Sequence, residues 1–122
     1  MQTKHLIMIE IKHLATTKLQ NDISRLTFEL EYKGGTNFKC ELVVNLTWLF
    51  GTLQEISVDN YYLQKDSFKE TFHIDILDKI AKKSSRFKWQ LIGLVSFNGK
   101  YSRLKGKGKI IKNPYSIRKN PT

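Results

Sequence analysis

This sequence of 122 residues contains one cysteine and two prolines. Its last third, residues 79–122, contains no acidic side chain. The single cysteine, Cys40, excludes an internal disulfide, so a reducing compartment is expected. No apolar run approaches the roughly 18 residues that a membrane-spanning helix requires. The run at residues 6–9 is too short, and too soon followed by charge, for a signal peptide. The sequence therefore predicts an intracellular protein, in the cytoplasm, nucleus or nucleoid, that is not secreted.

Catalytic and metal-binding patterns are missing as well. The three histidines are scattered, and with one cysteine they give no zinc-ligand spacing. No glycine-rich loop of the phosphate-cradling kind lies between a predicted strand and a predicted helix. No Ser-His-Asp or Cys-His arrangement can be proposed from the spacing. We therefore expect no cofactor, no metal and no catalytic residue.

Charge of one sign dominates the C-terminal third. Residues 1–78 carry 8 basic and all 11 acidic side chains, whereas residues 79–122 carry 13 basic side chains and none that is acidic. The formal net charge is +10 and the pI about 9.8. Such asymmetry is typical of proteins that bind nucleic acid, an anionic membrane or an acidic protein. The alternative is a solvated face that only keeps the protein soluble.

Apolar alternation predicts strands in the N-terminal half, over residues 5–14, 25–32 and 37–46. A three-residue loop at 34–36 pairs the second of these with the third, with Tyr32 opposite Phe38 and Glu31 opposite Lys39, and keeps the apolar side chains on one face. In that register Cys40 is a small core side chain rather than a nucleophile.

The middle of the chain allows two interpretations. Residues 47–63 fit a short helix reaching Glu55 and then an extended connection, or another strand. The capping-box pair Ser67 and Glu70 precedes apolar residues that recur every four positions, which predicts one main helix around 67–84. The competing interpretation is a strand, because Phe72, Ile74 and Ile76 alternate.

Asn98-Gly99, between the alternating segments 86–97 and 100–111, is a strong signal for a hairpin with a two-residue type I′ turn. The register that follows places Trp89 opposite Gly108, where the missing side chain leaves room for the ring. One face then collects the apolar residues. Ile92 and Leu94 are exceptions, which a local bulge would redirect.

The other face of this hairpin carries the predicted binding residues. Arg103, Lys105, Lys107 and Lys109 recur every second residue, so their cations repeat every ~6.6–6.8 Å along a strand. Lys88 lies across from Lys109 and adds to the row. These five, together with Lys112 just beyond the hairpin, are the candidate phosphate contacts, and Tyr101 on the same face is the candidate for stacking on a base.

The expected organisation is one α+β domain over residues 1–112, mostly antiparallel, followed by a flexible basic tail over 113–122. The order of three strands, a helix and a closing hairpin fits a five-stranded OB-like barrel. A meander sheet with one helix packed on it fits equally.

The predicted function is non-enzymatic binding of nucleic acid, with single-stranded DNA or RNA favoured. Selectivity for sequence is expected to be weak because lysines are point charges. An accessory protein of a virus or mobile element is the kind of protein expected. The sequence leaves DNA against RNA and the oligomeric state open.

Two alternatives remain. The basic face fits an acidic protein partner, as in a phage- or plasmid-type inhibitor. Asp22 with Glu31 and Lys33 also resembles the carboxylate pattern of Mg²⁺-dependent nucleases of restriction-enzyme-like folds. No membrane partner is expected, because the cations follow a strand pattern rather than an amphipathic helix.

Overall fold

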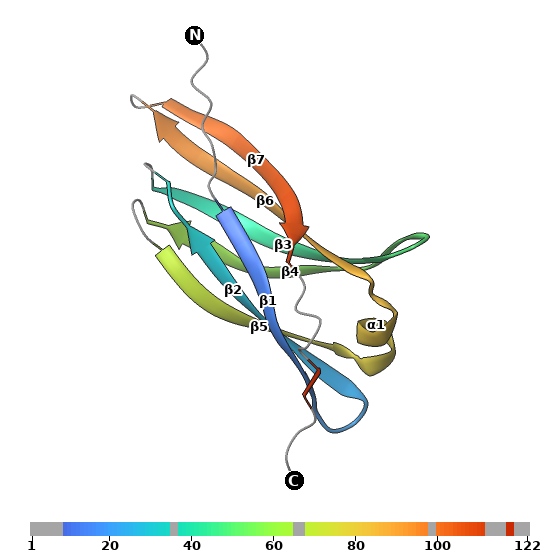
Figure 1. Ribbon diagram of the computed structural model, residues 1–122. Coiled ribbons are helices and arrows are strands. Elements are labelled where there is room, and N and C mark those ends of the chain that lie inside the picture. Colours follow the sequence, from blue (N-terminus) through green and yellow to red (C-terminus); the bar gives the residue numbers. More distant parts are fainter. Residues whose placement is uncertain (1–8, 35–36, 65–67, 98–99, 112–116, 119–122) are drawn as a thin grey trace.

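The computed structural model describes residues 9–34, 37–64, 68–97, 100–111 and 117–118. These residues form β1 (Ile9–Lys18), β2 (Ile23–Tyr32), β3 (Phe38–Trp48), β4 (Gly51–Leu63), β5 (Phe68–Leu77), α1 (Asp78–Lys83), β6 (Arg86–Phe97), β7 (Lys100–Ile110) and β8 (Ile117–Arg118). The strands make two four-stranded sheets, which we call sheet A, in the order β5-β2-β1-β8, and sheet B, in the order β4-β3-β6-β7 (Figure 1). All neighbouring strands are antiparallel except β1 and β8.

The two sheets share one core and make a sandwich. The chain passes from sheet A to sheet B after β2, returns after β4, and crosses again after α1. Over β1 to β7 this order resembles that of immunoglobulin-like sandwiches, with the fourth strand beside the third rather than the fifth. The mostly antiparallel α+β prediction agrees with this architecture in outline. The described strands form no closed barrel, and the OB-like alternative therefore gains no support.

Aromatic rings join the two sheets at the centre of the core. Phe28 of β2 is 0% exposed. Its ring stacks on Phe72 of β5 at a centroid distance of 5.2 Å and meets Phe87 of β6 edge-on at 5.7 Å. His13 of β1 lies against both Phe28 and Phe87. Side chains of both sheets thus pack around Phe28, which fixes the position of β6 over sheet A.

The predicted pairing of residues 25–32 with 37–46 is wrong. β2 pairs with β1 and β5, whereas β3 pairs with β4 and β6 in the other sheet. Alternation shows that each strand has one apolar face. It does not show whether two such strands pair in the same sheet or lie across the core from each other in opposite sheets. Glu31 accordingly lies beside Glu10 and Lys69 and not beside Lys39.

Cys40 is buried in the core, as predicted. Burial raises the pKa of its thiol to about 11, because the charged thiolate is disfavoured away from water. The thiol is therefore protonated at neutral pH and serves as packing.

The predicted helix over 67–84 is also wrong for most of its length. Residues 68–77 form β5, whose register against β2 runs unbroken from Phe68 opposite Tyr32 to Leu77 opposite Ile23. The helix contains only residues 78–83, and Ser67 of the predicted capping box lies outside the described residues. The two-residue period of Phe72, Ile74 and Ile76 decides the outcome, because it buries all three against sheet B.

The segment 47–63 contains no helix. After a tight turn at Leu49-Phe50 it forms β4, which is the outer strand of sheet B. An outer strand is half solvated, and two register shifts interrupt its pairing with β3. Both features weaken the two-residue period by which a strand is recognised in a sequence.

One edge of the sandwich is closed by the chain after β7. The His13 N–H donates to the carbonyl of Ile111 at 2.9 Å, and the Ile111 N–H donates to the carbonyl of Ile11 at 3.3 Å. Farther along β1, Thr16 and Thr17 pair in parallel with β8. The free edge of β1 is therefore covered.

Asp78 joins the start of α1 to sheet A. Its carboxylate accepts a 2.7 Å hydrogen bond from the buried Ser24 hydroxyl and lies 3.0 Å from the Lys82 ammonium and 3.5 Å from that of Lys18. The Ser24 hydrogen bond, followed by the hydrogen bond to Lys82, holds the pKa of Asp78 below its ordinary value.

This lowered pKa predicts an acid-dependent contribution to stability. Because the folded pKa lies below the unfolded one, the contribution is complete above about pH 4 and is lost as the pH falls through the folded pKa. We expect Asp78→Asn to lower the Tm at pH 7, and the difference from wild type to shrink towards pH 3. The measurement is thermal unfolding by circular dichroism, with Glu55→Gln on β4 as the control. A difference that is the same at pH 7 and pH 3 would contradict the assignment.

Candidate nucleic-acid interface

The β6–β7 ladder has the predicted register throughout. Pairs run without a shift from Phe97 opposite Lys100 to Phe87 opposite Ile110. The turn residues, Asn98 and Gly99, lie outside the described residues, so the turn type stays a prediction. The predicted bulge at Ile92 is wrong: the ladder is continuous, and Ile92 remains half-buried on the outer face opposite Lys105. The side chain of Leu94 lies outside the description.

Trp89 and Gly108 set which face of this ladder is turned inward. Trp89 is only 7% exposed. A Cβ atom on Gly108 would lie 2.7 Å from three atoms of the indole ring, which is closer than a methyl group can approach. The ring therefore lies directly over the glycine backbone, as predicted. With the inward positions fixed in this way, alternate residues of both strands must point to solvent.

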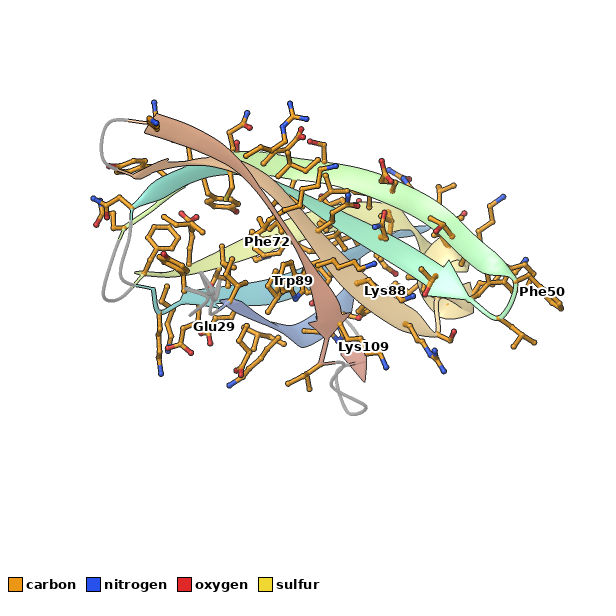
Figure 2. The ribbon with its side chains drawn as sticks, turned by 90° about the horizontal axis from the view of Figure 1, so that it is seen from above. Glu29, Phe50, Phe72, Lys88, Trp89 and Lys109 are labelled. Carbon is orange, nitrogen blue, oxygen red and sulfur yellow. The ribbon has the colours of Figure 1, made fainter. Side chains whose placement is uncertain are left out.

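The basic surface is the outward face of this hairpin, formed by Lys88, Arg103, Lys105, Lys107 and Lys109. All five are exposed, and Lys88 is directly opposite Lys109 (Figure 2). Neither β6 nor β7 contains an aspartate or glutamate. Tyr101 pairs with Ser96 in the ladder, but its side chain is outside the description, as is all of Lys112.

Carboxylates elsewhere in the fold leave this surface unpaired. Within the described ranges, every ion pair lies in or directly beside β1, β2, β5 and α1; Arg25 and Asp75, for example, make two hydrogen bonds of 2.8 and 3.0 Å. On sheet B the acidic residues belong to β3 and β4: Glu41 accepts a hydrogen bond from Ser57, and Glu55 and Asp59 lie on the outer strand. Among the described strands of sheet B, the cations thus gather on β6 and β7, with Lys39 of β3 as the exception.

The nuclease pattern is not assembled. Asp22 is in the turn before β2, with φ of 58°, whereas Glu31 is near the far end of the same strand. Nine residues of strand separate them, or about 30 Å, which is too far for one Mg²⁺ to bridge. In the part of the chain that the structure describes, no three His, Cys, Asp or Glu side chains lie close enough to hold a metal ion.

The β3–β4 tip, formed by Trp48, Leu49 and Phe50, is a feature that the sequence prediction missed. Leu49 is 85% and Phe50 76% exposed. The Phe50 ring meets Trp48 edge-on at 4.8 Å, and the Lys83 ammonium lies 3.7 Å from the centre of a Trp48 ring. The sequence left this stretch open between a helix and a strand, and the signal that could have revealed the tip was a bulky apolar run ending in Gly51.

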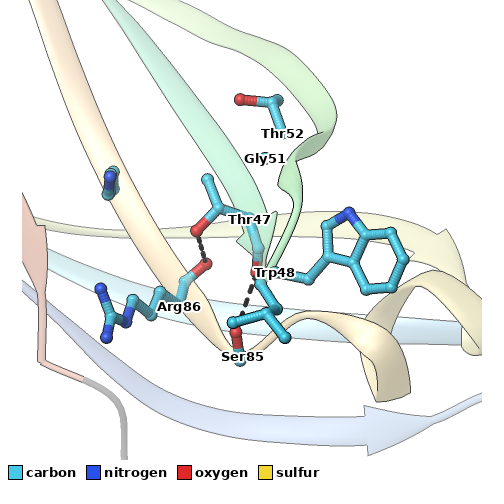
Figure 3. A pocket seen from close by; sticks show the side chains of 8 residues that line it. Thr47, Trp48, Gly51, Thr52, Ser85 and Arg86 are labelled. Atoms are coloured by element: carbon cyan, nitrogen blue, oxygen red, sulfur yellow. Dashed lines mark hydrogen bonds between the residues drawn. The ribbon is translucent and has the colours of Figure 1, made fainter.

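A cavity of about 500 Å³ lies beside this tip and is lined by residues that include Trp48, Thr52, Arg86 and Lys88 (Figure 3). Its walls are tied together by backbone and hydroxyl contacts. The Thr47 hydroxyl donates to the Arg86 carbonyl at 3.2 Å, and the Ser85 N–H donates to the Thr47 carbonyl at 2.9 Å. The start of β6 is thereby held against the end of β3.

Comparisons with known proteins show only distant structural similarity. No protein-family model matches the sequence, and no curated protein matches it. IrmA from Escherichia coli has a TM-score of 0.43 at 11% identity, covering 93% of this chain and 92% of that one. The alkylpurine DNA glycosylase AlkC of Pseudomonas fluorescens, bound to DNA, has a TM-score of 0.39 at 13% identity, covering 84% and 30%. A Bifidobacterium adolescentis GH3 β-glucosidase has a TM-score of 0.40 at 6% identity, covering 82% and 17%.

These likenesses carry no argument about function. Among the described residues, no helix is long and apolar enough to cross a membrane.

Proposed function

We propose that the protein is a non-enzymatic, intracellular nucleic-acid-binding protein that uses the basic surface to hold phosphates, with single-stranded DNA or RNA favoured. The observation that carries the proposal is the row of exposed cations on β7, with Lys88 opposite Lys109 and no carboxylate on either strand. Like charges directly opposite each other destabilise a sheet. A polyanion bound along the row relieves that repulsion.

Affinity would come mainly from electrostatics. A polyanion that neutralises these cations releases its condensed counterions, and the gain in their entropy drives binding. Lysine ammonium groups contact phosphates without reading bases, so discrimination between sequences is expected to be weak. Tyr101 remains the proposed stacking residue on the hairpin, and Lys112 a further phosphate contact.

A fluorescence titration with a labelled oligonucleotide at 50 and 200 mM salt tests the proposal. Five phosphate contacts give a log–log salt slope of about −3.5 for a single strand, or roughly 100-fold weaker binding at the higher salt. Unlabelled single-stranded and duplex competitors then rank the two forms. Absence of binding at 50 mM salt, or binding that is insensitive to salt, would refute the proposed function.

An acidic protein partner is the second candidate, because point charges on a solvated strand suit carboxylates as well as phosphates. That partner predicts a stoichiometric complex with one protein and little affinity for random oligonucleotides. The same titration separates the two candidates, since only the nucleic-acid proposal predicts tight binding to an arbitrary oligonucleotide at low salt.

A further inference from the structure

The β3–β4 tip is the most exposed apolar feature among the described residues. The side chains of Leu49 and Phe50 are mostly exposed to water. They lie at a turn that projects beyond the body of the sandwich (Figure 1). Large apolar side chains gathered at one exposed point mark interaction sites more often than chance. Gly51, at φ of 127°, supplies the backbone conformation that lets β4 begin directly after them.

Cations surround this tip. Lys83 lies over Trp48. Arg86 and Lys88 line the adjoining cavity together with two hydroxyl-bearing residues, Thr52 and Ser85. A ligand that fits must therefore combine a flat apolar group, hydrogen-bonding edges and negative charge. A nucleotide combines all three.

The cavity is continuous with the basic surface. Lys88 belongs to both, because it lines the cavity and stands opposite Lys109 in the ladder. Figure 2 shows Lys109 at the end of β7. From Lys109 the row continues along β7 away from the tip through Lys107 and Lys105. The carboxylates of Glu55 and Asp59 belong to β4, the edge strand at the opposite end of the same sheet from β7, and β3 separates Glu55 from Lys88. The path of positive charge thus leads along β7 to the tip.

From these observations we infer that the β3–β4 tip and its cavity are a base-stacking site at one end of the nucleic-acid interface, which makes single strands the substrate class. This inference rests on the proposed function. Phosphates follow the β7 cations to Lys88 and Arg86, and an unpaired base packs on the Phe50 ring. Bases in a duplex are stacked on one another and offer no free face, so a duplex gains only the phosphate contacts.

An anionic membrane is the rival occupant of an apolar tip with flanking cations. The apolar tip could insert into a membrane. A membrane surface would not, however, fill the adjoining cavity, which is lined by hydroxyl groups and two cations. The continuity of the cavity with the β7 row also favours a thin, extended polyanion over a broad planar surface. Nucleic acid therefore accounts for more of the site.

The test compares two ligands of equal length and charge: a single-stranded oligonucleotide and the same backbone with abasic positions throughout. We expect Phe50→Ser to weaken binding of the first by about 5- to 150-fold, the range for loss of one stacked base, and to leave the second unchanged. Phe50→Trp should restore the affinity, because it restores an aromatic face. Leu77→Ser, which removes an exposed apolar side chain from β5, is the control and should change neither.

The outcomes separate this inference from the function on which it rests. If wild type binds both ligands but Phe50→Ser binds them as wild type does, the stacking site is wrong and the phosphate-binding function stands. If wild type binds neither ligand, the proposed function itself fails. Binding to phosphatidylserine vesicles that is lost in Phe50→Ser, without any effect on oligonucleotides, would assign the tip to membranes instead. Circular dichroism confirms that the variant is folded, which is expected for a side chain with so little buried area.

Discussion

Reversing the charge of Arg103, Lys105 and Lys107 together to glutamate is expected to abolish binding to single-stranded oligonucleotides. Each change removes a phosphate contact and adds a repulsive charge along the same row. Affinity should fall by more than 100-fold at 100 mM salt, and any remaining binding should have a log–log salt slope about 2 units shallower, as three lost contacts imply. Fluorescence anisotropy over a range of salt concentrations measures both quantities.

Stability should survive this triple change, because the three side chains are exposed and take part in no ion pair among the described residues. The matched control reverses Lys12, Lys33 and Lys69, which lie on or beside sheet A, and alters the net charge by the same amount. If the effect belongs to the basic surface, the control keeps most of the affinity. Equal losses in both variants would show that net charge alone drives binding, and unchanged affinity in the first would refute the interface.

Phe28→Ala is expected to have the largest effect on stability. The ring is fully buried and contacts Phe72 in its own sheet and Phe87 in the other. Its removal leaves a cavity between the two layers and should lower the free energy of unfolding by about 3–5 kcal/mol. That is a large part of the roughly 5–15 kcal/mol that stabilises a domain. Urea denaturation followed by tryptophan fluorescence measures the loss.

Glu29→Ala, one position along the same strand, is the control for this change. Its carboxylate points outward and makes a 3.9 Å contact with Lys69, and an exposed pair of this kind contributes less than about 1 kcal/mol. A Phe28→Ala variant only as destabilised as the control would mean that the layers are not joined through this ring.

The C-terminal hairpin was predictable because its information is local. The Asn98-Gly99 pair predicts where the chain turns, and counting outward from it gives each pair of the ladder, so the pairing of Trp89 with Gly108 needs no reference to the rest of the chain. The positions of the basic residues followed from the same counting. What they bind is a matter of chemistry that the fold does not decide.

The partners of β2 and β3 were not predictable in the same way. Apolar alternation shows that one face of each strand is buried. It does not show whether β2 and β3 pair in one sheet or belong to the two opposed sheets. β2 lies between β1 and β5, and β5 is some 45 residues further along the chain. The order β5-β2-β1 depends on how the two sheets bury their apolar faces against each other. That packing involves residues far apart in the chain, so no short stretch of sequence reveals it.

Local sequence was also insufficient for residues 68–77 and for the tip. Phe68, Phe72, Ile76 and Ile80 fit a helical stripe, yet in the structure Phe72, Ile74 and Ile76 satisfy a strand that completes sheet A. At the tip, the sequence does not distinguish Leu49 and Phe50 from core residues, because apolar side chains are usually buried. Their exposure becomes visible only when β3 and β4 are seen to turn beyond the edge of the core.

Because β1 pairs with β8 and with Ile111, its outer edge cannot be paired until the C-terminal part of the chain has been synthesised. Thr16 is synthesised about 100 residues before its partner Ile117, an interval of about 5–20 s at about 5–20 residues per second. During that interval the nascent chain displays an unsatisfied row of amides and carbonyls on β1. The outer edge of β1 is the part of sheet A that waits longest for its partner, because β2 and β5 both precede Ile117 in the chain.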